Sequence, residues 1–380
     1  MVSVGIKDAF SRTVFLLGAG ASLDAGCKTS AGMLTSLKEE IQALPIDDKR
    51  KDFLAIYDFI MQSLIYQKAL KDPDRKISEI TNVEDYVAVL RQMIDREYVV
   101  PAPLVGNWNS KITSWEIKNE NIFKDFLDFI YERLISSWIK FDQEKAAELV
   151  APIKELLLTS ESFDLTIFSL NYDLVFESSF NSEYESLVYN GFSRNKWEGD
   201  FLDPNIEAKL KLYKLHGSQN WYFDEEEEEV KIGSPEENGV KPLIVFGSGP
   251  KIQSYDPFLT LLADFRKKLK DATLYVVIGY SFQDKYINNI LIQSLNSGLN
   301  RKMIVVDPGE NLAPIEFVKK IERFQSSRSL NEVVSLTRIS PERVQIEKIT
   351  AKQFFKQYMK NNASELVKIF NEVEEGDVVF

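Results

Sequence analysis

Cysteine and histidine are almost absent from this sequence. Its 380 residues include one cysteine, Cys27, and one histidine, His216. A disulfide within the chain is excluded, and the cysteine and histidine ligands of a conventional structural zinc site are too few to form one. We therefore expect a protein that holds no zinc.

A basic excess and long apolar runs are missing as well. The 46 lysines and arginines against 58 acidic residues give a formal net charge of -12, so we expect no direct binding of nucleic acid. The opening segment MVSVGIKDAFSR has no apolar signal-peptide core, and no apolar run reaches membrane-spanning length. We expect a soluble, cytoplasmic protein that does not bind membranes, with a packed core because 44% of its residues are hydrophobic.

Several short apolar segments each end in small or polar residues, which is typical of buried strands. They are TVFLL (13–17) before GAGAS, FDLTIFSL (163–170) before NYD, KLKLYKL (209–215) before HGS, PLIVF (242–246) before GSG, TLYVVIGY (273–280) before SFQD, and MIVVD (303–307) before Pro308. Helical patterns follow several of them, notably at 257–270 and 284–296. This alternation predicts an α/β fold with a mostly parallel sheet.

A long helical block separates the first strand from the second. Apolar residues recur at spacings of three and four from about 30 to 160, and Asn82 is a candidate N-cap followed by acidic residues. Two more helical patterns, 313–325 and 351–372, flank a strand-like VVSLTRI near the end of the chain. The acidic run DEEEEEV (224–230) lies between strands and is typical of a solvated hairpin tip.

Each motif alone has an ordinary structural explanation. GAGAS supplies Gly18 and Gly20 of a dinucleotide-binding turn, but Leu23 occupies the third glycine position, and a tight strand-to-helix turn fits equally well. Asn171 and Asp173 could simply cap the next helix, and His216 could be a packed residue near a turn.

The predicted parallel sheet favours a functional interpretation of these motifs, because it places them together. In open parallel sheets, ligands bind beyond the carboxyl ends of the strands, and this rule gathers the polar turns on one edge. The single histidine lies at that edge. An imidazole is the side chain whose unperturbed charge changes near neutral pH, so this position suits proton transfer.

Taken in order, GAGAS, LNYD, LHGS, VFGSG, IGYSFQD and VVDP resemble the motif series of the sirtuin superfamily. The resemblance spans roughly residues 13–310 and includes a helical insertion at about 35–160. By motif the chain is most similar to the zinc-less bacterial branch found in anti-phage defence proteins, where sequences such as NVED (82–85) recur in the insert. It implies a Rossmann-like NAD-binding catalytic domain in 1–310 and a C-terminal extension in 311–380 for assembly or partner contact.

Three departures separate the chain from protein-deacylating sirtuins. No cysteine follows HGS, where those enzymes place a four-cysteine zinc module. LDAGCKTSAGM follows the glycine turn in place of their Pro-Asp-Phe-Arg, and Leu170 stands where they usually have Gln. These differences disfavour binding of an acyl-lysine peptide and leave NAD binding intact.

The resemblance implies cleavage of the nicotinamide–ribose bond of NAD, with water as the acceptor and ADP-ribose as the product. Charge builds on the ribose as in glycoside cleavage, so the site needs a positioned base and a polar cradle. His216 is the implied base, Asn171 orients the ribose and water, and Asp173 supports their loop. The remaining candidate cofactor contacts are Gly18, Ala19, Gly20, Ser22, Asp24, Gly247, Gly279, Ser281 and Asp307. The turn at 18–22 and residues 279 and 281 would face the pyrophosphate, and Asp307 would bind the adenosine ribose.

Two other functions remain open at this point. A zinc-independent deacylase or ADP-ribosyltransferase would require a second substrate, whereas a non-catalytic NAD or ADP-ribose sensor would bind without turnover. The resemblance also implies a homo-oligomer, in some systems with a HerA-like ATPase partner, and a role in bacterial anti-phage defence.

Overall fold

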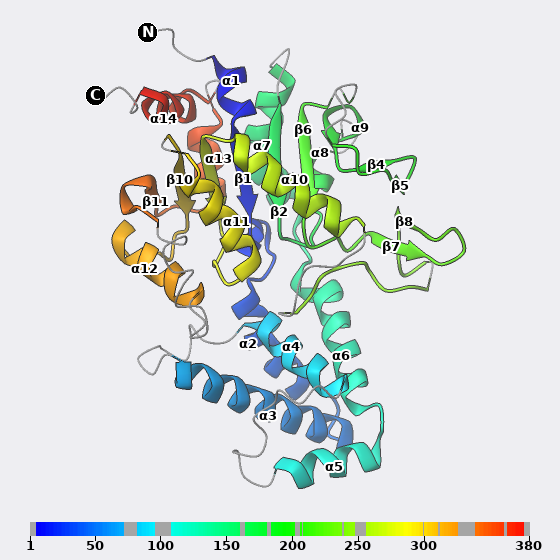
Figure 1. Cartoon of the computed structure of the whole chain (residues 1–380). Coiled ribbons are helices and arrows are strands. Elements are labelled where there is room, and N and C mark those ends of the chain that lie inside the picture. Colours follow the sequence, from blue (N-terminus) through cyan, green and yellow to red (C-terminus); the bar gives the residue numbers. More distant parts are fainter. Residues whose placement is uncertain are drawn as a thin grey trace. The chain divides into compact units, whose positions relative to one another are not determined.

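The computed structural model divides the chain into two compact units, coloured along the sequence in Figure 1. The sheet unit comprises Met1–Cys27, Phe141–Ile244 and Ile252–Phe380, and the helical unit comprises Lys28–Lys140 and Val245–Lys251. The residues that the structure describes are 5–71, 82–95, 108–159, 164–180, 184–201, 206, 208–237, 239–247, 256–298, 300–310, 312–325, 339–360 and 363–375.

The sheet unit is built on a seven-stranded sheet in the order β11-β10-β9-β1-β2-β6-β3, in which every pairing is parallel. The strands are β1 Thr13–Leu17, β2 Leu165–Ser169, β3 Val188–Tyr189, β6 Leu210–Lys214, β9 Leu274–Ile278, β10 Lys302–Val306 and β11 Val344–Glu347. All residues of β1, β2 and β9 are buried, because helices cover both faces. The predicted Rossmann-like α/β fold with a mostly parallel sheet is confirmed.

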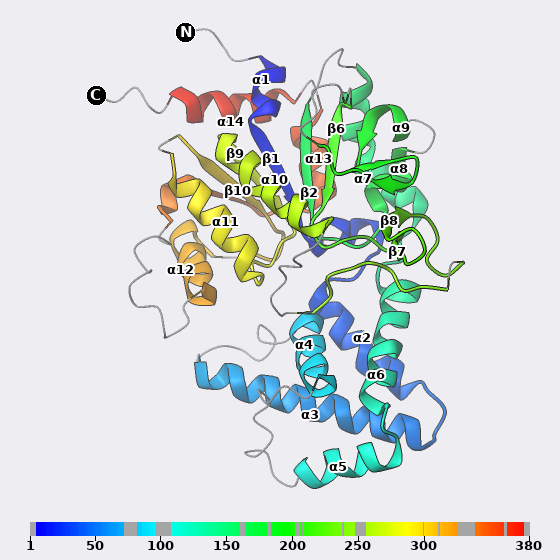
Figure 2. The ribbon, with the colours of Figure 1, turned by 45° about the vertical axis from the view of Figure 1, so that its right-hand side comes forward.

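Two apolar cores lie on opposite faces of this sheet, because side chains alternate along each strand. Phe15 and Leu17 belong to one core, and Val14 and Leu16 belong to the other. The first core is covered by α1 Ile6–Ser11, η1 Ala19–Ala25, α7 Gln143–Thr159, α8 Val175–Phe180, α13 Ala351–Tyr358 and α14 Ser364–Glu375. The second is covered by α10 Phe258–Asp271, α11 Lys285–Asn296 and α12 Pro314–Gln325, and Figure 2 shows α10 and α11 over that face. The sheet unit also contains two short helices, α9 Tyr184–Leu187 and η7 Pro341–Arg343.

The expected strand at 242–246 is wrong. Only Ile244 pairs there, as an isolated antiparallel bridge with Gly217. The backbone of Leu243 bonds instead to residues 218 and 221: its N–H donates to Trp221 O at 2.7 Å, and its carbonyl accepts from Ser218 N–H at 3.3 Å. Pro242 has no N–H to contribute to a ladder.

The C-terminal part of the chain joins the sheet unit through β11, which pairs with β10. The pattern at 351–372 forms two helices rather than one, since α13 ends before Met359 and α14 begins after Ala363, whose φ is +51°. Arg12 forms a two-pronged ion pair with Glu374 on α14, at 2.7 and 3.0 Å. Most of the strand-like VVSLTRI (333–339) lies outside the described residues.

The helical unit contains α2 Ser30–Gln42, α3 Asp48–Lys71, α4 Val83–Ile94, α5 Trp108–Lys118, α6 Ile122–Arg133 and a π-helical turn, η4 Leu134–Trp138. Asn82 caps α4 as predicted, its side chain accepting from Asp85 N–H at 2.8 Å. Phe53 and Tyr86 pack against Phe126 in its aromatic core. None of the described helices is both long and apolar enough to cross a membrane.

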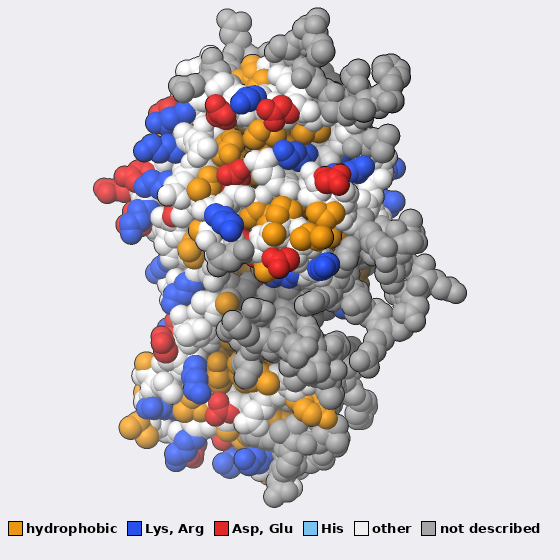
Figure 3. Space-filling view, turned by 90° about the vertical axis from the view of Figure 1, so that its left-hand side faces the viewer, with side chains coloured by type: hydrophobic (Ala, Val, Ile, Leu, Met, Phe, Trp, Pro, Cys, Tyr) orange, Lys and Arg blue, Asp and Glu red, His pale blue; other side chains and the backbone are white. Residues whose placement is uncertain are grey.

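Charged side chains of both signs are interspersed on the face shown in Figure 3. Lysine and arginine side chains alternate there with aspartate and glutamate.

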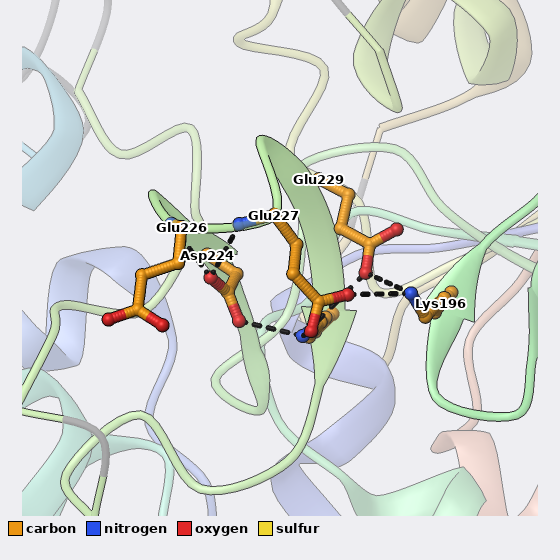
Figure 4. Close-up of polar contacts among 6 residues, drawn as sticks. Lys196, Asp224, Glu226, Glu227 and Glu229 are labelled. Atoms are coloured by element: carbon orange, nitrogen blue, oxygen red, sulfur yellow. Dashed lines mark hydrogen bonds and ion pairs between the residues drawn. The ribbon is translucent and has the colours of Figure 1, made fainter.

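A second, four-stranded sheet has the order β4-β5-β8-β7 and is antiparallel throughout. Its strands are β4 Phe192–Ser193, β5 Lys196–Trp197, β7 Trp221–Asp224 and β8 Glu229–Ile232. The acidic run is the tip of the β7–β8 hairpin, as predicted. Figure 4 shows how its carboxylates converge on lysine: Lys196 lies 2.6 Å from Glu227 and 2.7 Å from Glu229, and Lys231 lies 2.7 Å from Asp224.

We predict an acid-sensitive hairpin. The Lys196 and Lys231 ammonium groups lower the pKa of Glu227 from 4.5 to about 2. Because the folded hairpin binds this proton less readily than the unfolded chain, the ion pairs stabilise it fully above pH 4.5, and that stabilisation is lost as the pH falls toward 2. An NMR titration should give a Glu227 midpoint near 2. Lys196→Met should raise it toward 4.5.

A lysine outside the network supplies the control for this titration. Lys145→Met on α7 should leave the Glu227 midpoint where it is. A midpoint near 4.5 in the unaltered protein would contradict the ion network.

Candidate functional site

The glycine turn after β1 packs backbone to backbone against the turn after β9. Gly18 N–H donates to Ile278 O and Gly20 N–H donates to Gly279 O, both at 2.9 Å. A β-carbon on Gly18 would lie 2.6 Å from Gly279 O, so only glycine allows this approach. Gly18, Gly20 and Gly279 are thus brought together as predicted from the strand ends.

The helix that follows the glycine turn differs from the expectation. It is the seven-residue 3-10 helix η1, which ends at Gly26 with φ +107°. Because the Gly20 N–H is already bonded to Gly279, that donor is not available to a phosphate. Ala19 and Ser22 lie within η1, Ser22 being buried.

Asn171 follows β2 and contacts the glycine turn directly. Its Nδ2 donates to Ser22 Oγ at 3.1 Å, and both side chains are buried. Asp173 Oδ1 accepts from Val175 N–H at 3.1 Å and thereby starts α8. The NYD corner is therefore fixed on one side to the 18–22 turn and on the other to α8.

His216 follows β6 and is 5% exposed. Its Nε2 lies 3.3 Å from Asp284 Oδ2. Within the described part of the chain, Nδ1 is buried and has no hydrogen-bond partner. The ring lies beside Tyr172, with 6.4 Å between ring centroids, and Gln219 N–H donates to Tyr172 O at 3.0 Å. The HGS turn and the NYD corner are therefore adjacent.

Asp284 is the residue that sequence reasoning missed. Its Oδ1 accepts from the N–H groups of Tyr286 and Ile287, so it caps α11, while Oδ2 faces His216. Asp284 is the first residue of the helical pattern at 284–296, where an acidic residue usually indicates an N-cap, and nothing in the local sequence indicates its contact with His216. Asp284 is part of the SFQD motif, but the sequence does not show that it pairs with His216, which lies 68 positions earlier.

The 279–284 segment crosses the carboxyl edge of the sheet. It leaves β9 and reaches His216 beyond β6, although β1 and β2 lie between those strands. Buried Asn288 holds the segment: it accepts from Tyr280 Oη at 2.8 Å and donates to Phe282 O at 2.6 Å. Phe282 has φ +57°, a conformation that costs energy and persists because its surroundings enforce it.

Ser281 and Asp307 line one small pocket, beside Glu310 and Lys320. Glu310 and Lys320 form an ion pair at 2.7 Å, and Asp307 Oδ1 accepts from Gly309 N–H at 2.9 Å. The pocket thus combines two of the predicted cofactor contacts.

Two further predicted contacts, Asp24 and Gly247, lie apart from this pocket's lining. Asp24 Oδ2 accepts from Lys352 N–H at 2.9 Å and joins η1 to α13. Gly247 belongs to the helical unit, where a β-carbon on it would lie 3.1 Å from the Val87 side chain. The other predicted site residues belong to the sheet unit.

Residues 165–327 match the family model of the SIR2-like domain. This match agrees with the resemblance to sirtuins over residues 165–327. The glycine turn lies before the matched range, yet it bonds to Asn171 and Gly279 within it. No curated protein matches the chain.

Several solved Sir2 structures are similar to the whole chain. One is a Sir2 complex with a peptide and NAD+, 13% identical, covering 93% of this chain and 95% of that one, with a TM-score of 0.40. A Sir2 homologue–NAD complex is 12% identical, with coverages of 95% and 89% and a TM-score of 0.37. A Sir2 structure bearing on mechanism and regulation is 13% identical, with coverages of 95% and 96% and a TM-score of 0.37.

Buried polar side chains gather at the carboxyl edge of the sheet. Within the described residues, the edge carries the buried Asn171 amide and the buried His216 Nδ1, which has no hydrogen-bond partner there. Among the residues that the structure describes, no group of three or more His, Cys, Asp or Glu side chains could hold a metal ion.

Replacing Gly279 should destabilise the sheet unit strongly. In Gly279→Ala the β-carbon would lie 2.3 Å from Ala21 N at a φ of +62°, so we expect a loss of roughly 2–5 kcal/mol in the free energy of unfolding. Chemical denaturation followed by circular dichroism measures it.

Gly239→Ala is the matched control for this change. Gly239 has φ +66° with nothing within 4 Å of an added β-carbon, so the loss should be only about 1–2 kcal/mol. Equal losses in the two variants would show that the contact with the glycine turn is not as tight as described.

Proposed function

We propose that the protein hydrolyses NAD+ at the nicotinamide–ribose bond and releases nicotinamide and ADP-ribose. The observation that carries this proposal is the buried His216, which faces a carboxylate through Nε2 and whose Nδ1, beside the Asn171 corner, has no hydrogen-bond partner among the described residues. When Nε2, which lies 3.3 Å from Asp284 Oδ2, carries the proton of a neutral imidazole, the lone pair is on Nδ1. Nδ1 is therefore the atom that we assign as the base.

The remaining groups divide the work of binding and orientation. The turn at 18–22 and Gly279 would lie along the pyrophosphate, and Asp307 in its pocket would accept hydrogen bonds from ribose hydroxyls. Asn171 would orient the ribose and the attacking water. His216 Nδ1 would take the proton of that water as its oxygen bonds to ribose, and nicotinamide would leave as a neutral group with the electrons of the broken bond.

The described contacts give Asp284 two tasks in this scheme. Its carboxylate orients the imidazole and stabilises the positive charge that the ring gains on taking a proton. The hydrogen bonds that it accepts as the cap of α11 hold the carboxylate in place. A base held in this way needs little rearrangement when the reaction begins.

The biological setting is proposed from the resemblance alone. It implies an effector of bacterial anti-phage defence that acts as a homo-oligomer, in some systems with a HerA-like ATPase. Such an activity would deplete the cell of NAD if unregulated, so control by assembly or by a partner fits the proposed reaction.

The decisive experiment incubates the purified protein with NAD+, first alone and then together with a HerA-like ATPase. Chromatography for nicotinamide and ADP-ribose gives the answer. Products from NAD+ without any peptide support the proposal. Turnover only with an acylated peptide would instead indicate a deacylase, and saturable NAD+ binding without turnover would indicate a sensor.

His216→Ala and Asn171→Ala should each nearly abolish nicotinamide release. A positioned base contributes on the order of 10²–10⁴-fold to rate, and the Asn171 amide also holds the corner against Ser22. Circular dichroism should show both variants folded. A purified variant of either kind that keeps most of its activity would refute the assignment.

Asp284→Asn separates the two tasks of Asp284. Asparagine caps helices about as well as aspartate, so thermal stability should change little. The loss of negative charge beside the imidazole should lower kcat roughly tenfold or more. If kcat is unchanged while the variant is folded, the carboxylate has no role beyond the cap.

A further inference from the structure

A buried lysine lies directly behind the proposed site. Lys214 is the last residue of β6, and its side chain is 3% exposed. Its ammonium group donates to the backbone carbonyl of Asp173 and lies 3.0 Å from Glu177 Oε1 on α8. A buried ammonium group is costly unless its donors are satisfied, and here both partners come from the segment that follows Asn171.

The contacts of Lys214 tie together the two elements that carry the proposed catalytic groups. Lys214 precedes His216 by two residues, and Asp173 follows Asn171 by two residues. The ammonium–carbonyl bond therefore joins the strand that places the imidazole to the corner that places the amide. No other lysine of β6 does this, since Lys211 donates to Phe201 O at 2.8 Å instead.

The cluster around Lys214 extends to the end of η1. The Cys27 thiol is hydrogen-bonded to Asp173, and burial, followed by the negative charge of Asp173, raises the pKa of that thiol well above its ordinary value. Burial also raises the pKa of Glu177, although Lys214 opposes the shift. The group therefore bonds β6, the NYD corner, α8 and η1 in one buried cluster.

A contribution to stability alone does not explain the ion pair between Lys214 and Glu177. Replacing a buried ion pair by apolar residues of similar volume is often neutral or stabilising, whereas removing one partner is strongly destabilising. A pair of apolar side chains would fill the space between β6 and α8, but it could not donate to the Asp173 carbonyl. The specific contribution of Lys214 is that directed bond.

We propose that Lys214 is a positioning residue for NAD+ cleavage, which sets the Asn171 corner against His216 through its bonds to Asp173 and Glu177. The inference rests on the proposed function, and it adds a residue that does not itself touch the substrate. A displacement of about 1 Å between reacting groups can cost on the order of a hundredfold in rate, so the effect is measurable.

The test uses a variant in which the pair is replaced as a whole, Lys214→Met with Glu177→Leu. Its melting temperature should stay near that of the unaltered protein, whereas Lys214→Met alone should melt several degrees lower because Glu177, whose side chain is only 14% exposed, is left without its partner. In the stable double variant kcat should fall roughly 10–100-fold, while KM for NAD+ changes much less. Lys211→Met is the matched control and should keep kcat.

A second readout does not depend on activity. Because His216 is the only histidine, its imidazole signals in an NMR spectrum of the tag-free protein are unambiguous. The double variant should shift or broaden these signals, and Lys211→Met should leave them unchanged.

The outcomes distinguish the two proposals. Unchanged His216 signals and full kcat in the stable double variant would overturn the role of Lys214. An unaltered protein without NAD+ cleavage would overturn the proposed function, and in that case shifted imidazole signals would still establish that Lys214 positions His216.

Discussion

Gly20 and Gly279 meet backbone to backbone, and the arrangement of the site depends on this contact. It joins the turns that follow β1 and β9 at the carboxyl edge of the sheet, and the 279–284 segment runs along that edge from this contact. That segment delivers Asp284 to His216, while the other side of the glycine turn receives Asn171 through Ser22. Any side chain at Gly20 or Gly279 would push these turns apart, because an added β-carbon would lie less than 3 Å from the backbone of the other turn.

The site combines burial with a small number of directed polar contacts. An imidazole that is nearly excluded from solvent, with a carboxylate on one nitrogen, is oriented and electrostatically supported for proton transfer. Directly behind it, Lys214 and Glu177 add a buried ion pair between β6 and α8. Beside it, the four-stranded sheet is held by ion pairs and packed tryptophans, such as Trp197 against Trp221.

The strands and their terminal motifs could be predicted from the sequence, because buried parallel strands are apolar throughout and end in recognisable turns. The predicted strand at 242–246 was wrong, since its backbone bonds to the loop at 217–221 rather than to a neighbouring strand. The edge strand β11 was missed because VQIE is short and half polar. The roles of Lys214 and Asp284 were not predictable either: each depends on a partner distant in sequence, and the local pattern of Asp284 indicates only a helix cap.

A structure determined with ADP-ribose bound would test the central claim most directly. The account predicts the pyrophosphate along the turn at 18–22 and Gly279. It also predicts the distal ribose within hydrogen-bonding distance of Asn171 and the Nδ1 atom of His216, which is buried and unpartnered in the described residues. ADP-ribose bound elsewhere on the protein, or a distal ribose beyond the reach of both side chains, would contradict it.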